Sequence, residues 1–169
     1  VANIPTEEIF TIPHKDKTEG VVVATKPLPA EVMIEDISLT FSKGRVIKAT
    51  AKKGEKFLKK MLERDDGASF LGEVALVPHS SPISKTGKIF YRLLYDENAS
   101  CHLAFGQCVR MCIKNGEIMS DEELLAAGCN ISGIHLDFMI GSEEMRVDGI
   151  LENGEIKAIL RNGEWAFDI

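Results

Sequence analysis

Apolar and polar positions alternate along most of this chain in short runs, a pattern that predicts a domain rich in β-strands. The runs are rich in β-branched and aromatic residues and are bounded by Gly, Pro, Asn or charged residues, as strands usually are. They predict strands over residues 9–12, 20–25, 37–41, 45–51 and 72–77. The intervening Ser42-Lys43-Gly44 is a turn signal, so the third and fourth of these strands are expected to form a hairpin.

Helical periodicity is confined to short segments. Apolar residues recur at helical spacing in residues 55–63, which predicts a helix there. Ser120 and Glu123 have the spacing of a capping box, so a second helix is predicted over 121–127, ending at Gly128. A further helix or helical turn is predicted over 88–95.

The last third of the chain has the signals of a strand meander, with turns at Asn153-Gly154 and Asn162-Gly163. No internal repeat or low-complexity tract interrupts the pattern. The fold class predicted is therefore α+β: a mixed, largely antiparallel sheet or a barrel-like domain with a few short helices. A chain of 169 residues fits one domain.

Composition excludes several classes of function. A net charge of −6 without a basic stripe argues against nucleic acid and anionic membranes as partners. The chain has no signal-peptide pattern and no apolar span of about 18 residues. Its four cysteines lack the CxxC pairs of a zinc ribbon or a redox motif, so reduced thiols and a cytoplasmic location are expected.

The strongest chemical signal is the run Ile-His-Leu-Asp-Phe-Met-Ile-Gly over residues 134–141. In an extended strand His135 and Asp137 share one face, because successive side chains alternate. A carboxylate in such an apolar strand needs a partner, since burying it alone costs several kcal/mol. An imidazole beside a carboxylate is the natural start of a transition-metal site. A simple structural hydrogen bond between the two is an equally good interpretation.

Further acids and imidazoles lie in apolar or irregular segments. Glu73 lies within an apolar strand, where an Arg or Lys counterion is the alternative to a metal; Glu97 and His102 lie close together in a segment that also reads as an ordinary loop. The donors outnumber the three that a mononuclear catalytic zinc site takes and suit two divalent ions about 3.5–4 Å apart. The six candidate donors in this chain are Glu7, Glu73, Glu97, His102, His135 and Asp137. Their spacing alone does not decide between a metal site and chance, because any acidic protein offers six such residues.

Eight blocks of this sequence resemble the M29 family of aminopeptidases, in the same order. They are Asn-Ile-Pro-Thr-Glu-Glu-Ile-Phe at 3–10, Pro-His-Lys at 13–15, Thr-Glu-Gly at 18–20, Leu-Gly-Glu-Val-Ala at 71–75, Ser-Pro-Ile-Ser at 81–84, Asp-Glu-Asn-Ala-Ser-Cys-His at 96–102, His-Leu-Asp-Phe-Met-Ile-Gly at 135–141 and Arg-Asn-Gly-Glu-Trp at 161–165. Members of that family are longer, two-domain enzymes that remove N-terminal residues from peptides with two divalent metals.

The resemblance implies that residues 1–169 are the C-terminal catalytic, metal-binding domain of such an enzyme, without the N-terminal domain. Family members are usually intracellular homodimers, so a homodimer acting on peptides with a free N-terminus is expected. The cofactors expected are two ions of zinc, cobalt, manganese or magnesium. The ligands that the resemblance implies are Glu7, Glu73 as the bridge, His102, His135 and Asp137, with Glu97 as a further ligand.

Two more residues are candidates for the reaction. Glu8 adjoins a ligand position and is the acid expected to move protons, although a solvated acid is the alternative. His14 is expected to contact substrate, or else to hydrogen-bond its own loop.

One position departs from the family pattern. The family places a tyrosine seven residues after the position of His102, and this chain has Val109 there. Valine cannot ligate a metal or donate a hydrogen bond to an oxyanion. The alternative function is therefore a catalytically weak or silent metal-binding or assembly module of the same fold. A two-metal phosphoesterase is disfavoured, because no phosphate-binding Gly-rich loop or Arg cluster is present.

Overall fold

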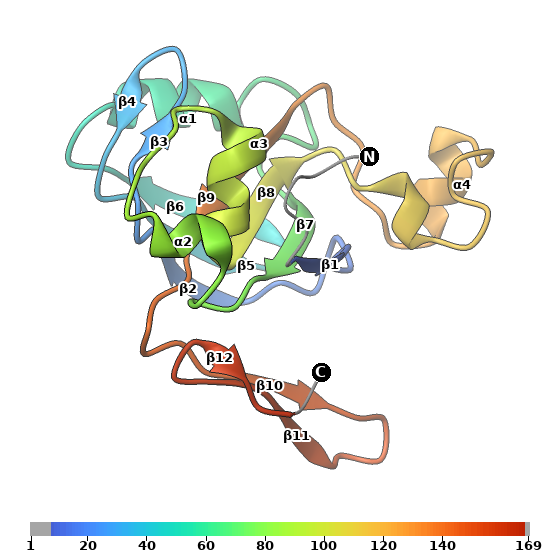
Figure 1. The fold of residues 1–169 in the computed structure, drawn as a ribbon. Helices are drawn as coiled ribbons and strands as arrows, with labels where there is room; N and C mark the ends of the chain where they lie inside the picture. Colours follow the sequence, from blue (N-terminus) through green and yellow to red (C-terminus); the bar gives the residue numbers. More distant parts are fainter. Residues whose placement is uncertain (1–7, 168–169) are drawn as a thin grey trace.

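A four-stranded antiparallel sheet lies at the centre of the computed structural model, which describes residues 8–167 (Figure 1). Its order is β1-β7-β8-β9, where β1 is Ile9–Thr11, β7 is Leu71–Leu76, β8 is His102–Gly106 and β9 is His135–Met139. These strands come from widely separated parts of the chain. The sheet therefore brings residues near positions 8, 73, 102 and 135 side by side.

One face of the central sheet packs on the main hydrophobic core. The facing sheet has the order β2-β5-β6, with β2 at Gly20–Val23, β5 at Ser38–Ser42 and β6 at Arg45–Thr50. Phe105 and Phe138 stack in this core with ring centroids 4.5 Å apart. Helix α1 (Glu55–Leu62) and the short ribbon of β3 (Leu28–Pro29) and β4 (Met33–Ile34) cover it from one side. The β5–β6 hairpin is confirmed, and its turn residues Lys43 and Gly44 have φ of 48° and 79°.

The remaining helices are short. They are α2 (Pro82–Lys85), α3 (Leu93–Asp96) with the 3-10 turn η1 (Glu97–Ala99), the 3-10 turn η2 (Arg110–Cys112) and α4 (Asp121–Ala126). The capping box that begins α4 is confirmed, with both Ser120 and Glu123 bonds formed. No helix between residues 8 and 167 is long and apolar enough to cross a membrane.

The predicted helix over residues 88–95 is wrong for most of its length, because α3 begins only at Leu93. The Asp96 carboxylate accepts hydrogen bonds from the backbone N–H groups of Phe90 and Arg92, at 2.8 and 3.1 Å. Tyr91 has a φ of 57°, which a right-handed helix does not allow. These two bonds therefore hold the segment before Leu93 as a loop around Asp96.

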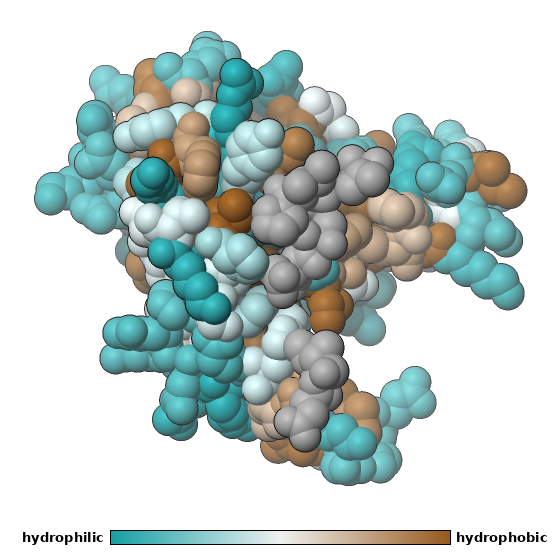
Figure 2. Space-filling view, in the orientation of Figure 1, coloured by the Kyte–Doolittle hydropathy of each residue, from teal (hydrophilic) through white to brown (hydrophobic). Residues whose placement is uncertain are grey.

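The C-terminal meander is confirmed as a separate sheet of β10 (Val147–Ile150), β11 (Ile156–Arg161) and β12 (Glu164–Trp165). It projects below the rest of the molecule in Figure 1, and Figure 2 shows apolar side chains on its surface. The described strands form four separate antiparallel sheets and no closed barrel, so the antiparallel-sheet form of the fold prediction is confirmed and the barrel-like form is wrong.

Candidate metal centre

The register of the central sheet places two carboxylates on either side of one alanine. Glu73 of β7 pairs with Ala104 of β8, and Ala104 pairs with Asp137 of β9. Residues directly opposite one another on neighbouring strands point to the same face. Ala104 is fully buried and has only a methyl group, so it leaves room between Glu73 and Asp137.

His102 lies two residues before Ala104 and therefore on the same face of the sheet. Its side chain is 1% exposed, and its Nε2 lies 3.4 Å from Oε1 of Glu8, whose side chain is 2% exposed. Glu8 immediately precedes the edge strand β1, and the start of that strand therefore places this carboxylate beside His102. The Nδ1 of His102 lies 3.0 Å from the carbonyl oxygen of Ser100.

His135 completes the other side of the centre. Its Nε2 lies 3.0 Å from Oε2 of Glu73 and 3.5 Å from Oδ1 of Asp137. Its Nδ1 lies 2.7 Å from the carbonyl oxygen of Gln107. Because a carbonyl oxygen only accepts hydrogen bonds, both imidazoles carry a proton on Nδ1. In the neutral ring the Nε2 lone pair then points towards the carboxylates, as in a metal-ligating histidine.

A β-bulge at Gly72 positions Glu73. The register between β7 and β8 shifts between Leu71 and Glu73, which leaves Gly72 as the extra residue. A Cβ atom at Gly72 would collide with the carbonyl oxygen of Gln107, the same oxygen that binds His135. Only glycine therefore allows this close approach of β7 to the backbone that orients the imidazole.

The side chains form three overlapping groups whose potential ligand atoms lie within 4.8 Å of one another. Glu73 belongs to two of them, and so do His102 and Asp137. The groups are Glu8 with Glu73 and His102, Glu73 with His135 and Asp137, and Glu97 with His102 and Asp137.

Crowding of carboxylates controls the electrostatics of the centre. Burial and the negative charge of Asp137 raise the pKa of Glu97 to about 7. Burial opposes protonation of His102, but its hydrogen bond with Glu8 and the charge of Asp137 outweigh that effect and raise its pKa to about 9. Hydrogen bonds with Asp137 and Glu73 raise the pKa of His135 to about 11. The centre thus favours positive charge, and its oxygen and imidazole donors fit divalent cations.

The structure brings together five of the six predicted ligands: Glu73, Glu97, His102, His135 and Asp137. Glu7, the sixth, lies outside the described residues. Glu8, predicted to move protons, lies with Glu73 and His102 in one of the three groups of possible ligand atoms. The partner of Glu73 is His135, and among residues 8–167 it forms no ion pair with Lys or Arg.

His14 belongs to none of these groups. Its Nδ1 accepts a hydrogen bond from the backbone N–H of Asp16 at 3.3 Å, and its ring packs against Gly128. This geometry corresponds to the loop-bonding alternative for His14.

Sequence reasoning missed the main-chain carbonyls of Ser100 and Gln107, because a backbone acceptor leaves no trace in residue type. The loop that follows Gln107 carries Val109, the position where the family pattern has a tyrosine. Burial raises the pKa of the Cys112 thiol, and the negative charge of Glu73 adds to the effect, so this loop borders the centre. Val109 immediately precedes the 3-10 turn η2 and is half-buried.

Comparison with known proteins gives one consistent family. The model of the family described as "Thermophilic metalloprotease (M29)" matches residues 1–165. Aminopeptidase AmpS of Bacillus subtilis is 52% identical over 168 residues, which is 99% of this chain and 41% of that protein. Aminopeptidase T of Thermus aquaticus is 47% identical over 164 residues, which is 96% of this chain and 40% of that protein.

Two solved structures resemble this chain, one in sequence and fold and the other in fold alone. Wild-type AmpT from Thermus thermophilus has a TM-score of 0.91 and 45% identity over 98% of this chain and 41% of that chain. The 2,5-dihydroxypyridine dioxygenase of Pseudomonas putida KT2440 has a TM-score of 0.57 and 16% identity over 93% of this chain and 42% of that one, a likeness of fold alone. The chain spans about 41% of the length of the curated relatives it matches.

Proposed function

Because this chain belongs to the thermophilic metalloprotease (M29) family, we propose that its cluster of acids and histidines is the dinuclear metal centre of an aminopeptidase. The full-length protein would remove N-terminal residues from peptides. Since the chain spans 41% of its relatives' length, residues 1–169 are proposed as the C-terminal catalytic domain of a two-domain enzyme. A homodimer and a cytoplasmic location stay predictions.

The shared carboxylate of Glu73 is the observation that carries the proposal. One carboxylate in two groups of donors suits a bridge between two divalent ions. Glu8, Glu73 and His102 would hold one ion, and Glu73, His135 and Asp137 the other, with Glu97 beside His102 and Asp137. Glu8 is thus proposed as a ligand instead of a proton shuttle. Carboxylates with imidazoles suit zinc, cobalt, manganese or magnesium.

Two bound divalent ions supply the polarisation of a carbonyl and the activation of water that peptide hydrolysis requires. The chain's own residues prepare the centre for them. The carbonyl groups of Ser100 and Gln107 fix the tautomer and the ring orientation of the two histidines. The free α-amino group of a peptide would be able to ligate one of these ions, which is consistent with cleavage at the N-terminus.

Metal analysis combined with aminoacyl-p-nitroanilide hydrolysis tests this proposal in the protein at its full encoded length. We expect Glu73→Gln to lose bound metal and activity together, with little change in the folding of the metal-free protein. Glu117→Gln removes a carboxylate from an exposed position and is the matched control. A Glu73→Gln protein that keeps two metals per chain contradicts the bridge.

The second candidate is a silent metal-binding module, which the valine at position 109 favours. An oxyanion donor is typically worth about 10²–10³ in rate. If Val109 marks a lost donor, the wild-type protein binds metal but turns over slowly, and Val109→Tyr raises kcat more than it changes KM. Wild-type turnover that is fast and unaffected by Val109→Tyr rules this candidate out.

A further inference from the structure

The two histidines of the proposed metal centre are held in different ways. His102 lies in the inner strand β8 and pairs with Ala75 of β7 on one side and Met139 of β9 on the other. His135 is the first residue of the edge strand β9, and its side chain is 34% exposed against 1% for His102. The sheet therefore fixes His102 from both sides, whereas the position of His135 depends on residues 130–134, which lead into β9.

Gln107 binds this entry to β9 at three points. Its N–H donates to the carbonyl oxygen of Ile134 at 2.6 Å, and its side-chain Oε1 accepts from the N–H of Ser132 at 3.0 Å. Its own carbonyl oxygen accepts the Nδ1–H of His135 at 2.7 Å. The orientation of the imidazole therefore depends on where residues 132–135 lie relative to Gln107.

Asp65 holds the same residues from a segment far away in the sequence. Its Oδ2 accepts from the N–H of Gly133 at 2.8 Å, and the Oγ of Ser132 lies 2.8 and 3.0 Å from its two carboxylate oxygens. Its Oδ1 also accepts from the N–H of Gly67 at 2.9 Å. The Oγ of Ser132 in turn accepts from the N–H of Ile134 at 3.2 Å. The carboxylate thus joins the loop after α1 to the start of β9.

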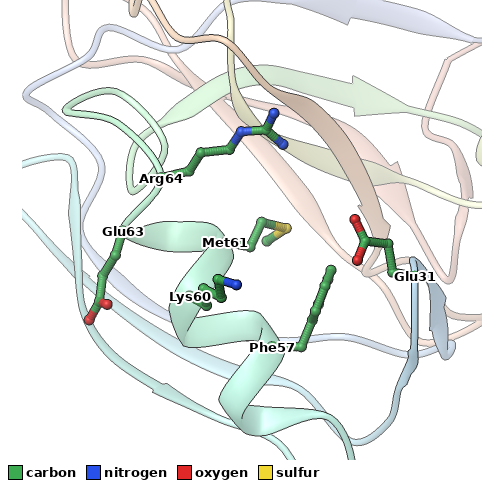
Figure 3. Close-up of a pocket in the computed structure, with 6 residues that line it drawn as sticks. All are labelled: Glu31, Phe57, Lys60, Met61, Glu63 and Arg64. Atoms are coloured by element: carbon green, nitrogen blue, oxygen red, sulfur yellow. The ribbon is translucent and has the colours of Figure 1, made fainter.

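An ion pair is not the role of this carboxylate. Figure 3 shows the side chain of the adjacent Arg64 extending over the hollow beside α1, above Met61. Over residues 8–167 Asp65 forms no ion pair with Lys or Arg, and its partners are N–H and O–H groups.

The partners of Asp65 require a carboxylate. Burial opposes its ionisation, but the hydrogen bonds from Gly133, Ser132 and Gly67 outweigh burial and lower the pKa of Asp65. The group is therefore charged at neutral pH, and its hydrogen bonds are of the stronger, charge-assisted kind. An amide in its place would turn an NH₂ group towards one of these donors and lose that bond.

We propose that Asp65 is a positioning residue of the metal centre, which holds the start of β9 so that the Nε2 of His135 meets Glu73 and Asp137. The inference rests on the proposed aminopeptidase function. Outer partners that orient a ligating histidine typically contribute about 10–100-fold to metal affinity. The effect should fall on the ion proposed for His135 and spare the ion beside His102, because the sheet holds His102 without this loop.

Binding of Co²⁺ to the metal-stripped protein of full encoded length tests the proposal. A titration in competition with a chelator, followed by the visible absorption of Co²⁺, gives a Kd for each ion. We expect Asp65→Asn to raise one Kd by about tenfold or more and to leave the other unchanged. The weakened ion should be the one that His135→Gln removes. Asp66→Asn makes the same chemical change at the adjacent, exposed position and should bind both ions like the wild type.

Imidazole NMR of the metal-free protein, labelled with ¹⁵N-histidine, separates positioning from stability. The Nδ1–H protons of His102 and His135 both bond to carbonyl oxygens, so both should be protected from exchange with water. Asp65→Asn should lose this protection at His135 alone, and Asp66→Asn at neither histidine. A purely structural role of Asp65 would lower stability and expose both rings alike.

Wild-type Kd values in Asp65→Asn, or equal losses at both ions, overturn the inference and leave the aminopeptidase function intact. A wild-type protein that binds no Co²⁺ contradicts the function instead, and the NMR measurement then decides the inference. Protection of His135 that is unchanged, or lost together with that of His102, overturns it. If Asp65→Asn does not fold, Ser132→Ala, which removes only the hydroxyl group between Asp65 and β9, is judged by the same criteria.

Discussion

The two faces of the central sheet differ as much as two surfaces on the same strands can. On one face Phe105 and Phe138 pack in the core. On the other, Glu73, His102 and Asp137 gather around small residues. Because side chains alternate along each strand, neighbouring residues serve opposite purposes.

The contrast shows how the molecule separates stability from chemistry. The apolar face gains free energy from burial and close packing. The polar face holds carboxylates close together in a buried setting, which costs free energy until a cation balances them. Three predictions test whether the two faces are as independent as this division implies.

The largest effect is expected on the apolar face. Phe105→Ala removes a fully buried ring and should lower the free energy of unfolding by about 3–5 kcal/mol. Urea unfolding of the metal-free protein measures this. Phe167→Ala is the matched control, since Phe167 is 51% exposed and should change stability by less than about 0.5 kcal/mol. Similar losses in the two variants would show that the core face contributes little.

A smaller change in stability, but a loss of metal, is expected on the polar face. Ala104→Leu fills the space between Glu73 and Asp137 and should cost about 1–3 kcal/mol of stability through overpacking. Because the bulk also separates the two carboxylates, metal content per chain should fall, as elemental analysis would detect. Ala104→Gly opens the same position without the bulk and should keep its metal. Normal metal content in Ala104→Leu would contradict the close fit.

The smallest effect is a slope of stability with pH in the metal-free protein. The pKa values of His102 and His135 are raised to about 9 and about 11. A raised pKa stabilises the folded state fully below the unfolded value of about 6.5, and the contribution is lost as pH rises through the folded value. The raised pKa of Glu97, about 7, acts in the same direction between about pH 4.5 and 7.

Thermal unfolding in EDTA should therefore show Tm falling as pH rises from about 6.5 towards 9 and beyond. His135→Gln should flatten the slope, whereas His79→Gln, outside the cluster, should keep it. Bound metal should remove the slope, because metal ligation requires neutral imidazoles and becomes stronger as protons leave. A metal-free protein whose stability rises over this pH range would refute the electrostatic description.

Local signals in the sequence predicted local structure well. The capping box of Ser120 and Glu123 begins α4, and the Asn162-Gly163 turn joins β11 to β12 with φ of 53° and 74°. These elements depend on hydrogen bonds and backbone preferences within a few residues. The failure over residues 88–92 has the opposite cause, because the side chain of Asp96 captures that backbone and no periodicity reveals it.

The sequence by itself determined the pairing of His135 with Asp137, since two residues of an extended strand must share a face. Only the tertiary structure decided that Glu8, and not a more distant acid, meets His102, and that Glu73 lies opposite Asp137. Those contacts depend on the strand order β1-β7-β8-β9 and on the bulge at Gly72. Register between strands is set by burial and backbone pairing over the whole sheet, so no short stretch of sequence encodes it.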